Sequence, residues 1–124
     1  MRKQKGFTLI ELLTVMTIIA VLAGLALVSY GGARKTARDG KRKADLEEIR
    51  SAMEMCYADD NRYPGVSFGN PLICVSGNKY LDSVPVDPIN SGSYIYTVSG
   101  SSATSYTICA RLETTGLPYC VSNP

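Results

Sequence analysis

The chain has 124 residues, with 13 basic and 11 acidic side chains, four cysteines, and neither histidine nor tryptophan. This length allows one small domain, and the lack of histidine removes the commonest acid-base catalyst and metal ligand. The composition therefore argues against an enzyme and against a cofactor, and the near balance of charge argues against a specific nucleic-acid partner.

The N-terminal segment combines a basic leader, residues 1–6, with an apolar stretch, residues 7–30, in which Glu11 is the only charged residue. A helix over residues 7–30 reaches about 36 Å, enough to cross a hydrocarbon core of about 30 Å. A secretory signal would have a shorter apolar region closed by small residues at a cleavage site, and this stretch does not. We therefore expect residues 7–30 to be retained as a transmembrane helix.

Glu11 lies within this apolar stretch, where a carboxylate is costly unless it is paired or near the interface. If the chain is cleaved after Gly6, the new α-amino group of Phe7 lies about one helical turn from Glu11 and supplies a positive charge. The amine can belong to the same chain or to a neighbour. Pairing between neighbours would fix the axial register of one copy against the next, which predicts an assembly role for Glu11.

The segment KGFTLIELL resembles the prepilin motif of type IV pilins and of the pseudopilins of type II secretion and competence systems. The resemblance implies cleavage between Gly6 and Phe7 by a prepilin peptidase, N-methylation of Phe7, and recruitment or registration of neighbouring subunits by Glu11. It implies a homo-oligomeric helical filament that is assembled by an inner-membrane assembly platform. Before assembly the subunit would be a single-pass protein of the cytoplasmic membrane with its head outside the cytoplasm, and afterwards part of a cell-surface or periplasmic filament.

Basic residues after the apolar stretch run against this orientation, because the positive-inside tendency would keep them in the cytoplasm. The leader motif and the cysteines both favour a cytoplasmic N-terminus, and we give them more weight. The basic residues are Arg34, Lys35, Arg38, Lys41, Arg42 and Lys43.

Residues 31–60 are expected to continue the same helix with one narrow apolar stripe, because apolar residues recur at steps of three and four. Glycines are weak helix formers, so the junction between the two halves of the helix could bend or melt, or could serve close helix packing. The stripe is Leu46, Ile49, Met53 and Cys56, and the glycines are Gly24, Gly31, Gly32 and Gly40.

Charges in this half are segregated, with the basic block at 34–43 ahead of the acidic residues at 45–60. One hypothesis is that the basic block of one subunit faces the acidic block of another, so that reversing the charges of Arg38 and Lys41 impairs assembly but leaves the monomer folded. The alternative is a solvated face with residues that anchor at lipid headgroups. A DNA-binding stripe is a third interpretation, which the lack of interleaved aromatic residues disfavours.

Residues 61–124 are rich in turn residues, and three segments alternate like half-buried strands: SYIYTVSG, TSYTICARLE and LPYCVS. We expect a small antiparallel sheet that covers the apolar stripe. The fold class is α+β, with one long N-terminal helix packed against a small antiparallel β-sheet head. The segments DDNRYP, YLDSVPVDP and YIYTVSG also resemble the loop-to-sheet region of major pseudopilins and pilins, less specifically than the N-terminal motif.

The cysteines contain no CxxC pair, which favours disulfides in an oxidising compartment over a zinc or redox site. Three ways of pairing the four cysteines are possible, and the sequence alone does not select one of them. Cys109 and Cys120 lie in successive strands around a short turn, where opposed residues are close enough for a disulfide. Cys56, late on the helix, would then pair with Cys74 in the returning loop.

Major pseudopilins often hold calcium in an acid-rich loop of the head. The head of this chain offers only Asp82, Asp87 and Glu113, scattered in sequence, whereas calcium needs six to eight oxygen ligands. We therefore expect no metal site, and a turn-forming role for Asp87 before Pro88.

The predicted function is a structural subunit of a type IV pilus or pseudopilus. One alternative is a minor pseudopilin or competence component that primes or tips a filament, and another is a monomeric membrane-anchored binding module. Long filaments in the electron microscope would favour an abundant subunit, and the monomeric module predicts that Glu11→Ala has no assembly to impair. No motif in the head selects among adhesion, motility, DNA uptake and secretion.

Overall fold

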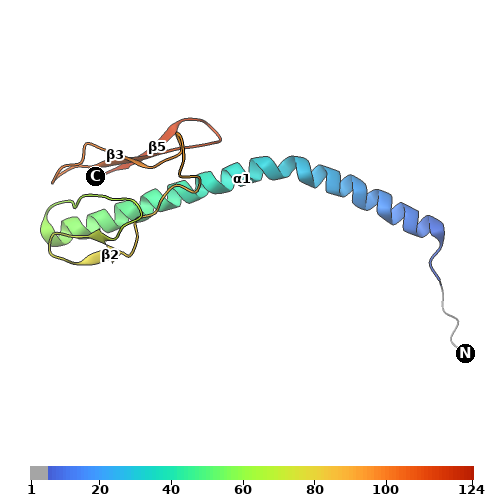
Figure 1. Ribbon diagram of the computed structural model, residues 1–124, viewed down its shortest axis with the longest axis horizontal. Helices are drawn as coiled ribbons and strands as arrows, with labels where there is room; N and C mark the ends of the chain where they lie inside the picture. The colour runs from blue at the N-terminus through green and yellow to red at the C-terminus, as the bar shows by residue number, and fades with distance from the viewer. Residues whose placement is uncertain (1–5) are drawn as a thin grey trace, which may run out of the picture. The chain divides into compact units, whose positions relative to one another are not determined.

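The computed structural model describes residues 6–124, which contain one helix and five short strands (Figure 1). The chain divides into two compact units, one ending at Arg34 and the other beginning at Lys35. The leader residues 1–5 lie outside the described range. The elements are α1 (Leu9–Asp60), β1 (Leu72–Ile73), β2 (Lys79–Leu81), β3 (Thr97–Ser99), β4 (Thr107–Arg111) and β5 (Pro118–Ser122).

Helix α1 begins with a capping box built from Thr8 and Glu11. The Thr8 hydroxyl oxygen accepts a hydrogen bond from the backbone N–H of Glu11 at 3.4 Å. In return the Glu11 carboxylate accepts the backbone N–H of Thr8 at 2.9 Å and its hydroxyl at 2.7 Å. This reciprocal arrangement satisfies N–H groups that a helix start leaves unpaired. The helix therefore begins at Leu9, two residues later than the sequence analysis placed it.

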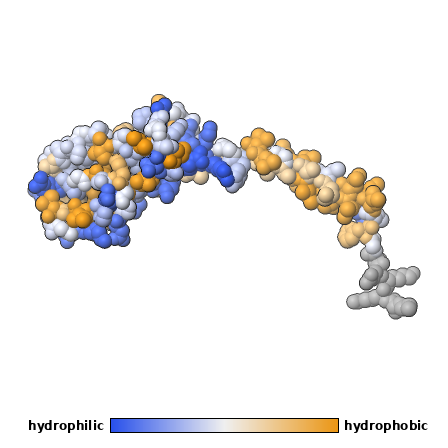
Figure 2. All heavy atoms as spheres, in the orientation of Figure 1, coloured by the Kyte–Doolittle hydropathy of each residue, from blue (hydrophilic) through white to orange (hydrophobic). Residues whose placement is uncertain are grey.

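The first part of α1 is long and apolar enough to cross a membrane, from Leu9 to Val28. None of this span is buried by the rest of the chain, and Figure 2 shows hydrophobic side chains along its visible face. The helix is continuous through the four glycines, so no local melting accompanies them. A Cβ atom added at any of them would meet nothing within 4 Å, so packing within the chain does not require glycine there.

The second part of α1 carries the core of the head. Leu46, Ile49, Met53 and Cys56 are each 0% exposed, which confirms the predicted apolar stripe. Strands and loops of the head cover this stripe with a cluster of apolar and tyrosine side chains. The covering residues are Tyr63, Leu72, Val84, Tyr96, Tyr106, Ile108, Ala110 and Val121.

The main sheet is antiparallel with the order β3-β4-β5. Within β4 the side chains of Ile108 and Ala110 are buried, and those of the alternating residues are not, as expected for one covered face. Strand β3 is shorter than the predicted segment because Tyr94 forms an isolated bridge with Ser91 instead of pairing with β4. Gly116, with φ of 70°, completes the tight turn between β4 and β5.

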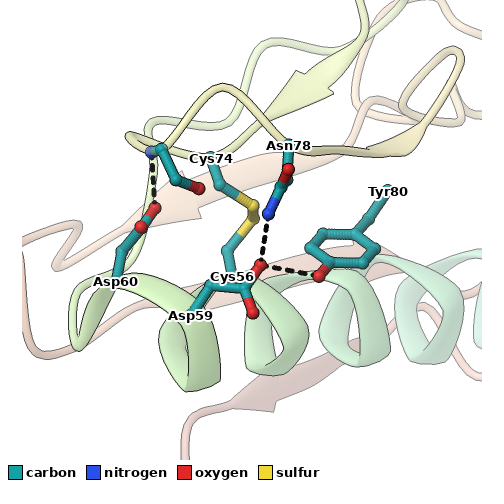
Figure 3. Close-up of a disulfide and its surroundings, with 7 residues drawn as sticks. Cys56, Asp59, Asp60, Cys74, Asn78 and Tyr80 are labelled. Atoms are coloured by element: carbon teal, nitrogen blue, oxygen red, sulfur yellow. Dashed lines mark hydrogen bonds between the residues drawn. A yellow bond between two sulfur atoms is a disulfide. The ribbon is translucent and has the colours of Figure 1, made fainter.

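A separate two-stranded hairpin, β1 and β2, was not predicted from the sequence. It is tied to the end of α1 by the Cys56–Cys74 disulfide (Figure 3). Asp59 accepts hydrogen bonds from the Asn78 amide at 2.8 Å and from the Tyr80 hydroxyl at 2.7 Å. These donors offset the unfavourable position of a carboxylate at the negative end of a helix dipole.

The second disulfide joins Cys109 to Cys120, which stand directly opposite each other in the register of β4 and β5. The structure therefore holds the two pairs that the sequence analysis favoured. The helix itself ends where Asn61 takes a left-handed φ of 55°, and the Asn61 N–H is bonded to the Tyr57 carbonyl at 2.8 Å. This is a common helix-terminating arrangement for asparagine.

Candidate functional site

The segment Gly6–Thr8 precedes the helix and has no regular secondary structure. The Phe7 side chain is 88% exposed. The peptide bond between Gly6 and Phe7 is therefore presented outside the helix, where a protease could accommodate it in an extended conformation. Their roles in cleavage and N-methylation stay predictions.

Glu11 uses one carboxylate oxygen, Oε2, for both of its bonds to Thr8. Among residues 6–124, no donor bonds to its other oxygen, and no basic side chain lies within 4 Å of the carboxylate. Glu11 therefore serves as a helix cap and still presents an acceptor oxygen to a partner from outside the described residues. The spacing Thr8-x-x-Glu11 is the sequence signature of this cap, and sequence reasoning missed it.

In the head, the guanidinium of Arg42 is fully buried and surrounded by three carboxylates. It donates two bonds to Asp87, from Nε at 2.6 Å and from Nη2 at 3.0 Å. Its Nη1 donates to Asp39 and to Glu113, both at 2.7 Å. Arg38 adds a second bidentate pair to Glu113, at 2.7 Å and 2.6 Å. We call these five residues the Arg42 cluster.

The Arg42 cluster attaches two loops of the head to α1. Asp39 accepts the backbone N–H of Glu113 at 2.8 Å and that of Thr114 at 2.9 Å, which fixes the turn between β4 and β5. Asp87 accepts the N–H of Ile89 at 2.8 Å, which holds the loop before β3. Every buried polar side-chain atom in the described part of the chain has a partner, so the cluster is internally satisfied.

This geometry corrects the hypothesis for the basic block. Arg38 and Arg42 bind carboxylates of their own head, so they do not present free charges to the acidic block of another subunit. Reversing the charge of Arg38 would place a carboxylate against Glu113 and disturb the folded head, contrary to the expectation that the monomer stays folded. The hypothesis is therefore wrong for Arg38 and Arg42, because the head folds back onto this part of α1. For Lys41, which is exposed, it stays a prediction.

Asp87 and Glu113 are two of the acidic residues that the head offers as calcium ligands, and the carboxylates of both accept hydrogen bonds from guanidinium groups. In the described residues, no three His, Cys, Asp or Glu side chains are placed to hold a metal ion. Asp87 does form the predicted turn, through its bonds to the N–H groups of Ile89 and Asn90. Its ion pair with Arg42 is an additional role that no local pattern indicated.

The Arg42 cluster should make the head sensitive to acid. Hydrogen bonds from Arg38, opposed by burial, lower the pKa of Glu113 to about 2. Burial alone would raise the pKa of Asp39 and of Asp87, but the hydrogen bonds that these carboxylates accept lower it by more than burial raises it. The pKa of each carboxyl group therefore lies below its usual value. Carboxylates with lowered pKa values stabilise the fold above their unfolded pKa, and this stabilisation is lost as the pH falls through the folded pKa.

We therefore expect the melting temperature of the full chain in detergent to be level near neutral pH and to fall between about pH 4 and pH 2. Near-ultraviolet circular dichroism of the tyrosines would follow the transition. The Asp82→Asn variant, which loses only the exposed ion pair with Lys79, should show the same pH profile. A melting temperature that does not change down to pH 2 would contradict this account.

Comparison with known proteins places the chain among filament subunits. Residues 1–27 match the family described as "Prokaryotic N-terminal methylation motif". The chain is 32% identical over 97 residues to type II secretion system core protein G of Escherichia coli K12, covering 69% of this chain and 67% of that protein. It is 46% identical over 63 residues to the type IV wide pilus major component PilA4 of Thermus thermophilus, covering 51% of this chain and 48% of that protein.

The similarity to core protein G recurs in other bacteria. The protein of Pseudomonas aeruginosa is 32% identical over 98 residues, covering 70% of this chain and 69% of that protein. The match spans less of other relatives, such as 43% of the protein of Pectobacterium carotovorum. No solved structure matches the chain. The prepilin motif, the long apolar helix and these relatives show that the chain belongs to the family of type IV pilins and type II secretion pseudopilins.

Proposed function

We propose that this protein is a structural subunit that is anchored in the cytoplasmic membrane before assembly and then polymerises into a helical pilus or pseudopilus. The observation that carries the proposal is Glu11 at the start of an exposed apolar helix, without a cation within 4 Å among the described residues. Such a helix must bury its side chains in lipid or against other helices. One relative is a major component of a type IV pilus, which supports self-association and not catalysis as the work of this chain.

Cleavage between Gly6 and Phe7 would complete the assembly site. The new α-amino group of Phe7, which the processing enzyme then methylates, is a cation close to Glu11. Cleavage keeps the Phe7–Thr8 peptide bond, so both Thr8 donors to Oε2 of Glu11 remain. The other oxygen stays available for the amine of a neighbouring copy. In a bundle of apolar helices this pairing is strengthened by the low dielectric and sets the axial register of the copies.

The partners follow from this sequence of events. They are a prepilin peptidase with N-methyltransferase activity, an inner-membrane assembly platform, and further copies of the chain. The head would lie outside the cytoplasm, which agrees with its two disulfides. The assembled form would be a periplasmic or cell-surface filament.

Glu11→Gln tests the proposal, because glutamine keeps an acceptor for the Thr8 cap and removes only the charge. We expect filaments to decrease at least tenfold, because the uncompensated amine of a neighbour would lose its partner in the apolar interior. Filaments sheared from cells expressing the chain with its assembly system would be counted by electron microscopy and immunoblotting. Mass spectrometry would show that the mature chain still begins at methylated Phe7.

The matched control is Thr8→Ala, which removes the hydroxyl of the cap but leaves the charge of Glu11. It should weaken the first turn by about 1 kcal/mol and keep filament formation. Wild-type filament numbers in Glu11→Gln, with normal processing, would contradict the proposed role of Glu11. A mature chain that retains residues 1–6 would contradict the processing step.

A further inference from the structure

Tyr30 and Arg34 form a pair one helical turn apart on the N-terminal unit. The Arg34 Nη2 donates to the Tyr30 hydroxyl at 3.4 Å, and the Arg34 Cζ lies 4.5 Å from the centroid of the Tyr30 ring. Both side chains are exposed. A guanidinium has five N–H donors, and no carboxylate among residues 6–124 lies within 4 Å of this one. Arg34 therefore has donors left for an acceptor outside the chain.

The pair lies just beyond the end of the apolar span. The 20 residues from Leu9 to Val28 match a hydrocarbon core of about 30 Å. Tyr30 then lies about 3 Å past the end of the span, within a headgroup layer about 5–7 Å thick. The Arg34 Cα lies about 9 Å past it, but its side chain points back along the helix to Tyr30. The guanidinium is thus held at headgroup depth.

Other arginines of the basic block cannot take this role. Arg38 and Arg42 have their charges compensated by Asp39, Asp87 and Glu113 within the head. This internal compensation also reduces the conflict with the positive-inside tendency, because two charges that seemed free on the translocated side are paired. The charge of Arg34 still needs a counter-ion at the membrane surface.

We propose that Tyr30 and Arg34 bind the phosphate of an anionic phospholipid at the outer surface of the cytoplasmic membrane, and so set the depth of the subunit before assembly. A guanidinium matches the geometry of phosphate oxygens and donates to them in pairs. A tyrosine ring favours the interface between lipid tails and headgroups. The inference rests on the proposed membrane anchoring of the subunit.

The full chain would be reconstituted into nanodiscs of phosphatidylcholine and phosphatidylglycerol in a 4:1 ratio, in which phosphatidylglycerol is the anionic probe lipid. Native mass spectrometry would count the phosphatidylglycerol retained on the released protein. We expect about fivefold enrichment over the bulk ratio, which corresponds to about 1 kcal/mol for one basic side chain at a membrane surface. Arg34→Gln should reduce the enrichment to the bulk ratio.

Lys41→Gln is the matched control, because it removes one exposed positive charge about two turns further from the span. It should retain the enrichment, and Tyr30→Leu should reduce it in part. Equal enrichment in the wild type and Arg34→Gln would overturn the inference, as would a wild type without enrichment. If Arg34→Gln instead lowers filament yield with lipid enrichment unchanged, the pair belongs to a contact between copies and the inference also fails. A chain that does not insert into the nanodiscs overturns the proposed anchoring as well.

Discussion

Replacing Arg42 with methionine is expected to destabilise the head by about 3–5 kcal/mol. The substitution keeps a long side chain but removes the guanidinium that is bound by Asp39, Asp87 and Glu113. Three carboxylates would remain close together at a buried site with Arg38 as the remaining cation of the cluster. Because a domain of this size has a total stability of only about 5–15 kcal/mol, a large part of the population would unfold under mild conditions.

Denaturant unfolding of the full chain in detergent, followed by tyrosine circular dichroism, would measure this effect. Lys41→Met is the matched control, because Lys41 is the exposed neighbour of Arg42 and its substitution should change stability by less than about 0.5 kcal/mol. Arg42→Lys should fall between the two, since an ammonium group keeps the charge but cannot form the paired bonds to Asp87. Equal unfolding midpoints for Arg42→Met and the wild type would rule out a stabilising role of the cluster.

Substitution of several cluster members separates charge burial from packing. If Arg42→Met is combined with Asp87→Asn and Glu113→Gln, the uncompensated charges are largely removed. Part of the lost stability should then return, as expected when a buried ion pair is replaced as a unit and not broken. The Arg42 cluster thus acts as an internal attachment for two loops, and its arginines are not free for contacts between subunits.

Features encoded by short-range patterns were predictable from the sequence. The steps of three and four that place Leu46, Ile49 and Met53 on one face are local, and burial follows from that periodicity. The facing positions of Cys109 and Cys120 follow from two strands joined by a short turn. The Thr8–Glu11 cap was also encoded locally, and its signature was present but missed.

Features that depend on tertiary contacts were not predictable. Arg42 and Asp87 are 45 residues apart, and no local pattern distinguishes Arg42 from its basic neighbours at 41 and 43. The selection is made by the head, which folds back and covers only the side of the helix that bears Arg42. Strands β1 and β2, with two and three residues, are too short to show an alternating pattern.

Replacing both Cys56 and Cys74 with alanine is expected to lower the stability of the head by about 3 kcal/mol and to detach the β1–β2 hairpin. The disulfide closes a loop with a sequence separation of 18, so its loss increases the entropy of the unfolded chain. Without it, the hairpin is attached to the end of α1 by the buried Leu72 side chain and by exposed hydrogen bonds of Asp59 and Asp60, each contributing about 1 kcal/mol. Leu72 is the only buried side chain of β1 and β2, so we expect these contacts without the disulfide to let the hairpin open more often.

The matched control is the double replacement of Cys109 and Cys120, whose sequence separation of 11 predicts a similar loss of about 3 kcal/mol. The local outcome should differ, because β4 and β5 remain paired through their backbone ladder over five residue pairs. Hydrogen exchange at the Cys74 amide, which donates to the Asn78 carbonyl at 2.8 Å, reports the opening of the hairpin. With position 74 as alanine, this amide should exchange much faster than in the wild type, whereas it should stay protected in the control. Unchanged protection in both variants would mean that Leu72 and the hydrogen bonds of Asp59 and Asp60 suffice to hold the hairpin on the helix.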